Sequence, residues 1–594
     1  MNEELLFELA PRADTRSAGS GRPPRPWRPL VLLLPAAVLV GVLLVLPLVT
    51  TIVVSLGGWG AHYRDVAADE GVRHAIRNSV WWLAFAPLVC LGGLGLARLG
   101  SGGRRGHAFL VGVFAAPVAA SALVSGIAFR LIFDPRPARG TVSALIGTVT
   151  GMEIPFLGSG WLWAVLASAF AWQWIGLAAV VFRTGLGEIP RDLLRVVRTF
   201  GAGPIRRLTS VIMPALFPVG ALVLVIVLVG TARIFDMVVI TAPGSMQDRF
   251  DVVGLHWWRW QDDLGDGAAA ALAVLMFLIV GGAALACLWG LSREWPGGGR
   301  PADPAPAATP ISVRSTTVRP ALRAAAGWRR WPTRLLAALA VVFWAMPLLV
   351  LVLTSAHTPR AAAGSGWWHG ALGLDSYRQA FGSGELASAL VSTGGRALAA
   401  AILLVLVAVP AAYALAWGGL SRMTVRVLIG LTAVLAVVPP QAVILPLGNV
   451  FHRLHLLGAP TSLVMLHAAF GTPLAVLLLR NAFTLVPRDV VRTRQLEPEP
   501  ASALLAVAAL SWPAVLTVAV LEFVLVWNDF VVGLLLGGSE AHQIMLVLFE
   551  ESRQFTTSSG VLAAESVVSL VIPLAIVLAT GKWLVRGLTE GVMR

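Results

Sequence analysis

The chain has 594 residues, of which 57% are hydrophobic and only 13% are charged, and its formal net charge is +14. Soluble domains contain about 25% charged residues, so this chain lacks the polar side chains that would cover a water-facing surface. The composition therefore excludes a soluble globular protein and favours a protein embedded in a membrane.

Apolar runs of about 20 residues recur along the sequence, and each is long enough to cross the hydrocarbon core of a bilayer. We predict twelve such spans, and hence an all-α, polytopic membrane protein. The spans lie near residues 29–57, 78–98, 108–132, 161–183, 211–233, 267–290, 333–355, 388–417, 426–449, 462–483, 511–536 and 561–586.

Basic residues are unevenly distributed between the segments that connect these spans. If the N-terminus is cytoplasmic, about 31 of the 45 Lys and Arg residues lie on or beside inner segments. Acidic residues fall largely in outer segments, as in WQDDLGDG at 260–267. Such asymmetry orients a polytopic protein, so both termini are predicted to be cytoplasmic. The positive charge then reflects topology and argues against nucleic-acid binding.

The span order divides the chain into two halves. A polar cytoplasmic tail, 1–28, precedes a first half of six spans at 29–291. A Pro-, Ala-, Gly- and Arg-rich stretch at 292–332 cannot bury a core and is typical of a flexible cytoplasmic linker. A second half of six spans follows at 333–594.

A sequence pattern repeats between the halves. Residues 183–195 and 480–492 both read R-x6-P-R-D-φ-φ-R, where φ is apolar, and they lie 297 residues apart. Each copy follows the fourth span of its half and precedes the fifth, on the same side of the membrane. The shared sequence, position and side predict two homologous six-helix halves.

The first copy opens a basic segment, 189–218, between two apolar runs. As a helix, residues 191–200 would gather their apolar side chains on one face and turn Arg195 and Arg198 away. Pro190 suits the first turn of such a helix and Gly201 its end. An interfacial helix on anionic headgroups explains this pattern. A helix that docks a cytoplasmic partner explains it equally well.

The spacing Pro190…Gly201-Ala202…Pro214…Pro218 resembles the cytoplasmic EAA loop of permeases in binding-protein-dependent ABC importers. Other stretches resemble the maltose and alpha-glucoside branch of that family. They are FDPRPARGTVSALIG and IFDMVVITAPG in the first half, and AVVPPQAVILPL and VWNDFVVGLLLGG in the second. The chain thus resembles a fused pair of permease subunits of an ABC sugar importer. This implies a type I importer permease fold and a place in the bacterial cytoplasmic membrane.

In that family these loops seat in separate ATPase subunits, so the resemblance implies docking through residues 184–209 and 481–510. The docking positions of the first loop are Arg191, Asp192, Arg195, Phe200, Gly201, Ala202 and Pro214. Those of the second loop are Arg488, Asp489, Arg492, Glu497 and Pro513.

Both loops depart from the family pattern. Arg195 stands where the family has glutamate and Phe200 where it has aspartate, while the second loop has Pro498-Glu499 in place of Gly-Ala. The two prolines of QLEPEPAS are expected to shorten or break a docking helix. A permease-like protein that no longer transports is therefore a further hypothesis.

The sequence offers no site for chemistry of its own. Its only lysine, Lys582, lacks the glycines and the Ser/Thr of a phosphate-binding loop, and no His/Cys cluster has metal-ligand spacing. We expect no catalytic residue, metal or cofactor in this chain, which is predicted to be a transport subunit and not an enzyme. The resemblance implies ATP and Mg on two ATP-binding cassette subunits. It also implies an extracellular or lipid-anchored solute-binding protein, a sugar and membrane lipid as partners.

Polar side chains inside spans are costly and mark transport pathways. The candidate pathway residues are Trp172, Gln173, Trp174, Asp236, Asn528 and Asp529. Aromatic rings beside amide or acid groups suit the apolar faces and hydroxyls of a sugar, and the family resemblance implies an oligosaccharide or glucoside. Interfacial tryptophans and helix–helix hydrogen bonds explain the same residues without a substrate.

A secondary transporter of the 6+6 major-facilitator type is the main rival. It also has twelve spans and a central loop, but its signature G-x-x-x-D-R-x-G-R-R needs an aspartate that ARLGSGGRRG lacks. It also predicts no repeated loop between spans four and five, which this chain has.

Overall fold

The computed structural model describes residues 28–594 with gaps at 100–112, 115, 190–198, 200–202, 204–205, 207, 233, 293–330, 496–500, 539–541 and 590–594. Across these described ranges the regular structure is helical, apart from one isolated bridge between His357 and Leu372. The predicted all-α fold is confirmed.

Eight single helices are long and apolar enough to cross a membrane, counting described residues only. Their spanning parts are Pro29–Ser55, Glu70–Ala97, Leu162–Gly187, Val253–Cys287, Ala338–Ser355, Glu385–Trp417, Pro460–Phe483 and Thr557–Gly581. The first comprises α1 (Arg28–Val40), a π-helical turn (Gly41–Val45) and α2 (Leu46–Ser55). The others belong to α4 (Glu70–Leu99), α8 (Leu162–Glu188), α13 (Val253–Ser292), α15 (Trp331–Ser355), α18 (Glu385–Trp417), α21 (Pro460–Phe483) and α27 (Phe555–Thr589).

The fifth predicted span of each half is a bent helix pair. In the first half Thr209–Phe217 meets Val219–Thr231 at 60°, mostly within α11 (Met213–Ala232). In the second half α23 (Ser502–Leu510) meets α24 (Trp512–Trp527) at 77°. Proline supplies no backbone donor, which explains the bends at Pro218 and before Pro513. Within the described ranges the number of candidate spans therefore rises from eight to ten if each pair counts as one.

Two of the predicted spans, 108–132 and 426–449, contain a break within their described residues. The first of these spans breaks at Ala120, and α6 (Ala122–Ile132) begins after it with Ser121 as N-cap. The second divides into α19 (Arg422–Leu435) and α20 (Gln441–Arg453), because Pro439 and Pro440 separate them. The third span is thus interrupted in both halves.

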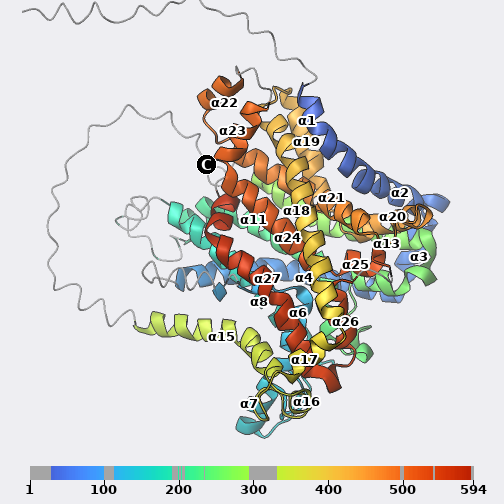
Figure 1. Cartoon of the computed structure of the whole chain (residues 1–594), viewed down its shortest axis with the longest axis vertical. Helices are drawn as coiled ribbons and strands as arrows, with labels where there is room; N and C mark the ends of the chain where they lie inside the picture. Colours follow the sequence, from blue (N-terminus) through green and yellow to red (C-terminus); the bar gives the residue numbers. More distant parts are fainter. Residues whose placement is uncertain are drawn as a thin grey trace, which may run out of the picture.

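Shorter helices connect the spans. They are α3 (Ala61–Ala68), α7 (Thr141–Thr150), α12 (Ile234–Thr241), α16 (Pro359–Ser365), α17 (Asp375–Gly382), α22 (Arg488–Gln495), α25 (Val531–Leu536) and α26 (Ile544–Ser552). In Figure 1, α22 and α23 lie at the top of the molecule, whereas α7, α16 and α17 lie at the bottom. Of the segments predicted to be inner, α22 thus lies at the opposite end from α7, α16 and α17, which were predicted to be outer, whereas α3, also predicted to be outer, lies at the right-hand edge of Figure 1.

The first span of each half packs against helices of the other half. Helix α1 packs against α18 and α21, and α2 packs against α20, although α1 and α2 precede these helices by more than 300 residues. Conversely, α15 contacts α6 and α4 as well as α27. The seam between the halves is therefore an extensive packed interface.

Candidate translocation and docking sites

The second predicted docking loop forms a short helix with one buried residue. Arg488, Asp489 and Arg492 are exposed on α22, whereas Val491 is 1% exposed and packs inward. The helix ends at Gln495, whose Nε2 donates to the Tyr413 hydroxyl of α18 at 3.2 Å. The described part of this helix has eight residues, and LEPEP at 496–500, where the two prolines were expected to break it, lies outside the described residues.

The structure describes two of the other predicted docking positions. Pro513 is buried at the first turn of α24, just beyond the bend after α23. Pro214 is half-buried on α11. The remaining predicted positions, Arg191, Asp192, Arg195, Phe200, Gly201, Ala202 and Glu497, lie outside the described residues.

Two of the predicted pathway residues meet at the break in the third span. Gln173 of α8 donates through Nε2 to the carbonyl oxygen of Ala120 at 3.1 Å. Asn528, which ends α24 in the other half, donates through Nδ2 to the carbonyl oxygen of Ala119 at 3.2 Å. The interruption before α6 frees these carbonyls from the helical ladder. Amides from both halves therefore converge on one peptide segment.

The two predicted tryptophans occupy different positions around Gln173. Trp172 is 2% exposed and donates through Nε1 to the carbonyl oxygen of Trp344 in α15 at 2.8 Å. Trp174 is half-buried and packs against Gly230 of α11, where a Cβ would stand 2.5 Å from its ring. Trp172 thus joins the halves, whereas Trp174 packs within the first half.

The two predicted acids lie beside aromatic rings at the seam. Asp529 is 6% exposed and caps α25, because its Oδ2 accepts from the backbone nitrogens of Val532 at 3.1 Å and Gly533 at 3.2 Å. Asp236 is 1% exposed on α12. The ring of Phe235, its neighbour, stacks on Phe530, the neighbour of Asp529.

Four aromatic rings form a closed circuit across the seam, in which each ring contacts two of the others. This arrangement was not predicted from the sequence. Phe235 and Trp258 come from the first half, and Phe530 and Phe549 from the second. The ring centroids are 5.8 Å apart for Phe235–Phe530, 5.1 Å for Phe530–Phe549, 6.4 Å for Phe549–Trp258 and 5.7 Å for Trp258–Phe235. Two of the rings belong to the sequence neighbours of Asp236 and Asp529, and this adjacency is the sequence signal that could have pointed to them.

A second junction between the halves lies beyond α6. The Arg130 guanidinium lies 4.0 Å from the centroid of the Phe555 ring, and that of Arg139 lies 5.4 Å from it. Arg139 also forms a buried ion pair with Asp134, at 3.3 Å between Nε and Oδ2. Burial lowers the pKa of Arg139, and Asp134 opposes that effect. This ring and its cations fasten α27 to the first half.

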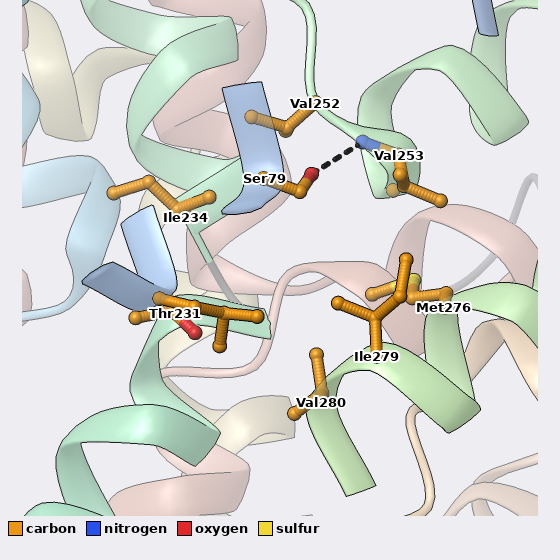
Figure 2. A pocket seen from close by; sticks show the side chains of 10 residues that line it. Ser79, Thr231, Ile234, Val252, Val253, Met276, Ile279 and Val280 are labelled. Atoms are coloured by element: carbon orange, nitrogen blue, oxygen red, sulfur yellow. Dashed lines mark hydrogen bonds between the residues drawn. The ribbon is translucent and has the colours of Figure 1, made fainter. Parts of the chain in front are cut away.

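Figure 2 shows a pocket among helices of the first half. Most of its lining side chains are aliphatic, and it also contains two hydroxyls: that of Ser79 accepts from the backbone nitrogen of Val253 at 3.0 Å, and that of Thr231 donates within its own helix. The lining residues are Ser79, Leu83, Thr231, Ile234, Val252, Val253, Gly254, Met276, Ile279 and Val280. None of the predicted pathway residues lines it.

The amino-acid sequence is similar to those of known transport proteins. Residues 91–288 match the model of the family described as binding-protein-dependent transport system inner membrane component. The chain is 26% identical over 278 residues to the osmoprotective compounds uptake permease protein GgtD of Synechocystis, covering 44% of this chain and 92% of GgtD. It is 28% identical to the trehalose transport system permease protein SugB of Mycobacterium tuberculosis, covering 37% of this chain and 82% of SugB.

The alpha-glucoside transport system permease protein AglF of Rhizobium meliloti is 26% identical, over 43% of this chain and 79% of AglF. Each of these relatives accounts for less than half of the chain while most of its own length is matched. The predicted resemblance to sugar permeases of ABC importers is therefore confirmed.

Proposed function

We propose that this chain is the transmembrane permease of an ABC importer, made of two fused permease halves, and that it translocates an uncharged oligosaccharide or glucoside. The observation that carries the proposal is the polar seam at Ala119–Ala120, where Gln173 and Asn528 from opposite halves converge. Polar groups between membrane helices are retained where they serve a pathway. The names of SugB and AglF support a carbohydrate as the substrate class.

The seam supports a mechanism of alternating access. In the present arrangement the amides of Gln173 and Asn528 are satisfied by backbone carbonyls, and four rings close the seam nearby. When the halves rock apart, these amides exchange their carbonyl partners for sugar hydroxyls, and the rings expose faces on which a sugar stacks. Because hydrogen bonds are exchanged and not lost, the cost of opening stays small enough for ATP binding and hydrolysis to drive it.

The cytoplasmic end supplies the docking surface in this proposal. The exposed face of α22 and the loop at 184–209 would each contact one ATP-binding cassette subunit, giving two such subunits. Both termini and the linker at 292–332 would lie on the same side. A solute-binding protein would deliver the sugar at the opposite end, where α7, α16 and α17 lie (Figure 1).

Co-purification from the native membrane tests the assembly. We expect an ATPase subunit and a solute-binding protein to accompany the full-length chain. Proteoliposomes containing that complex should take up radiolabelled trehalose or maltose when ATP is enclosed with the ATPase. Uptake driven by a proton gradient without any ATPase would instead support a secondary transporter. Assembly with neither ATP hydrolysis nor uptake would support a permease-like protein that no longer transports.

A further inference from the structure

Gln441 is a buried amide that none of the foregoing roles uses. It is 3% exposed and is the first residue of α20, directly after the Pro439-Pro440 break in the third span of the second half. Its Oε1 is buried, and no residue in the described ranges donates a hydrogen bond to it. Leaving a buried acceptor unpaired costs more than a typical formed hydrogen bond gains, so such an atom requires an explanation.

The side-chain amide of Gln441 lies beside residues of the other half of the chain. A Cβ placed on Gly254 of α13 would stand 3.3 Å from Gln441 Nε2, 3.5 Å from Met276 Cε and 3.6 Å from Phe235 Cβ. The absence of a side chain at Gly254 therefore leaves the space in which the amide lies. Gly254 and Met276 are also walls of the pocket in Figure 2. The amide thus lies at the seam, next to this pocket and to the ring circuit.

The corresponding break in the first half has a matching arrangement. There, Ser121 follows the interruption and the preceding carbonyls accept from amides of both halves. In the second half, Gln441 follows the interruption and points its amide at the first half. The two broken spans therefore both present polar groups at the seam. The carbonyls of Ala119 and Ala120 each accept from an amide, whereas Gln441 Oε1 has no donor among the described residues.

We infer that Gln441 determines substrate specificity by hydrogen bonding, through its carboxamide, to a hydroxyl of the transported carbohydrate. The inference rests on the proposed function. A carboxamide both donates and accepts, as a sugar hydroxyl does. The adjacent Phe235 ring supplies an apolar face for the same sugar once the circuit opens. No charged side chain is needed for this contact, which agrees with an uncharged substrate.

Uptake kinetics test this assignment in the purified complex with its ATPase and solute-binding protein. Initial rates are measured in proteoliposomes with radiolabelled trehalose and with maltose. For Gln441→Leu, which keeps the volume but removes the amide, we expect the transport KM to rise about tenfold, as for one lost hydrogen bond, with little change in the maximal ATPase rate. Gln441→Asn keeps an amide and should recover part of the affinity.

Gln543 provides a matched control. It is 4% exposed, its Oε1 also lacks a partner among the described residues, and its side-chain amide packs against Gly533, a residue of its own half. Gln543→Leu should leave KM unchanged even if it lowers stability. An equal KM for the wild type and Gln441→Leu would overturn the inference, and so would an equal rise in KM for both leucine variants.

A cysteine variant separates this inference from the proposed function. In Gln441→Cys, a small methanethiosulfonate reagent should modify the thiol while the complex turns over ATP, and trehalose or maltose should slow that modification. If the wild type imports sugar but the thiol never reacts, or reacts equally fast with and without sugar, Gln441 is not on the pathway and the proposed function still stands. If the wild type imports nothing, the proposed function itself fails.

Discussion

Asp134 accepts from two arginines that differ in exposure. Its pair with Arg139 is buried, with side-chain exposures of 2% and 3%, whereas Arg136, also 3.3 Å from the carboxylate, is 51% exposed. Removing one partner of a buried pair leaves an uncompensated charge and costs about 3–5 kcal/mol. An exposed pair contributes less than about 1 kcal/mol. The same carboxylate thus provides both a test and its control.

We therefore expect Arg139→Ala to lower the melting temperature of the detergent-solubilised chain by several degrees, and Arg136→Ala to leave it nearly unchanged. Differential scanning fluorimetry on the two variants measures the difference. Equal melting temperatures for both variants would show that burial of the Arg139 pair does not govern this junction.

The buried Asp251 should make the stability of the protein depend on pH. Burial raises the pKa of Asp251 above its ordinary value of 3.8, although the 2.8 Å hydrogen bond with His256 and the nearby Arg259 charge oppose this effect. The folded state therefore holds this proton more tightly than the unfolded state does. The stability it contributes is fully present below pH 3.8 and is lost as the pH rises through the raised pKa.

Asp251→Asn cannot ionise, so this loss should be absent from the variant. We expect the melting temperature of the variant to fall less than that of the wild type as the pH rises from about 4 to 7. Thermal unfolding at several pH values measures the difference between the two curves. Parallel curves would mean that Asp251 does not titrate differently in the folded state.

The sequence identified some site residues but not their partners. Gln173 and Asn528 could be predicted because an amide inside an apolar run is costly and conspicuous. Their acceptors, the carbonyls of Ala119 and Ala120, could not, because an alanine carries no sign that its backbone has left the helix. Gln441 was overlooked, since one polar residue after two prolines looks like an ordinary helix start.

At the scale of elements, Val491 is the buried side chain of α22. Val491 is 1% exposed and Val490 is 39% exposed, although the two are adjacent. A carboxylate at the buried position must be desolvated or must displace the helix, whereas one at the exposed position remains in water.

Val491→Asp should therefore displace α22 and abolish co-purification of the ATPase, while Val490→Asp should retain it. Pull-down of the ATPase with each variant, at matched membrane expression, measures this. Retention by both variants would argue against α22 as a docking element.

The interrupted spans show which element boundaries a sequence can predict. Pro439-Pro440 marks the break between α19 and α20, because neither residue supplies a backbone donor. The break before α6 has only Pro117 nearby, and there the Ser121 cap and the amides of Gln173 and Asn528 stabilise the interruption. Such tertiary contacts join residues more than 50 and 400 positions apart and leave no local pattern.

At the scale of the whole molecule, packing and not the linker should hold the halves together. The first span of each half lies against the other half. We predict that residues 1–291 and 333–594, expressed as separate chains, co-purify and recover sugar uptake. Affinity purification through a tag on one fragment, followed by an uptake assay, checks this. Failure of the fragments to associate would mean that the assembly needs the linker.

ATP-dependent sugar uptake by the reconstituted complex tests the central claim most directly. Proteoliposomes containing this chain, its ATPase and its solute-binding protein should accumulate radiolabelled trehalose or maltose only with ATP on the ATPase side, and a protonophore should have no effect. Accumulation that ignores ATP and collapses with the proton gradient would contradict the account.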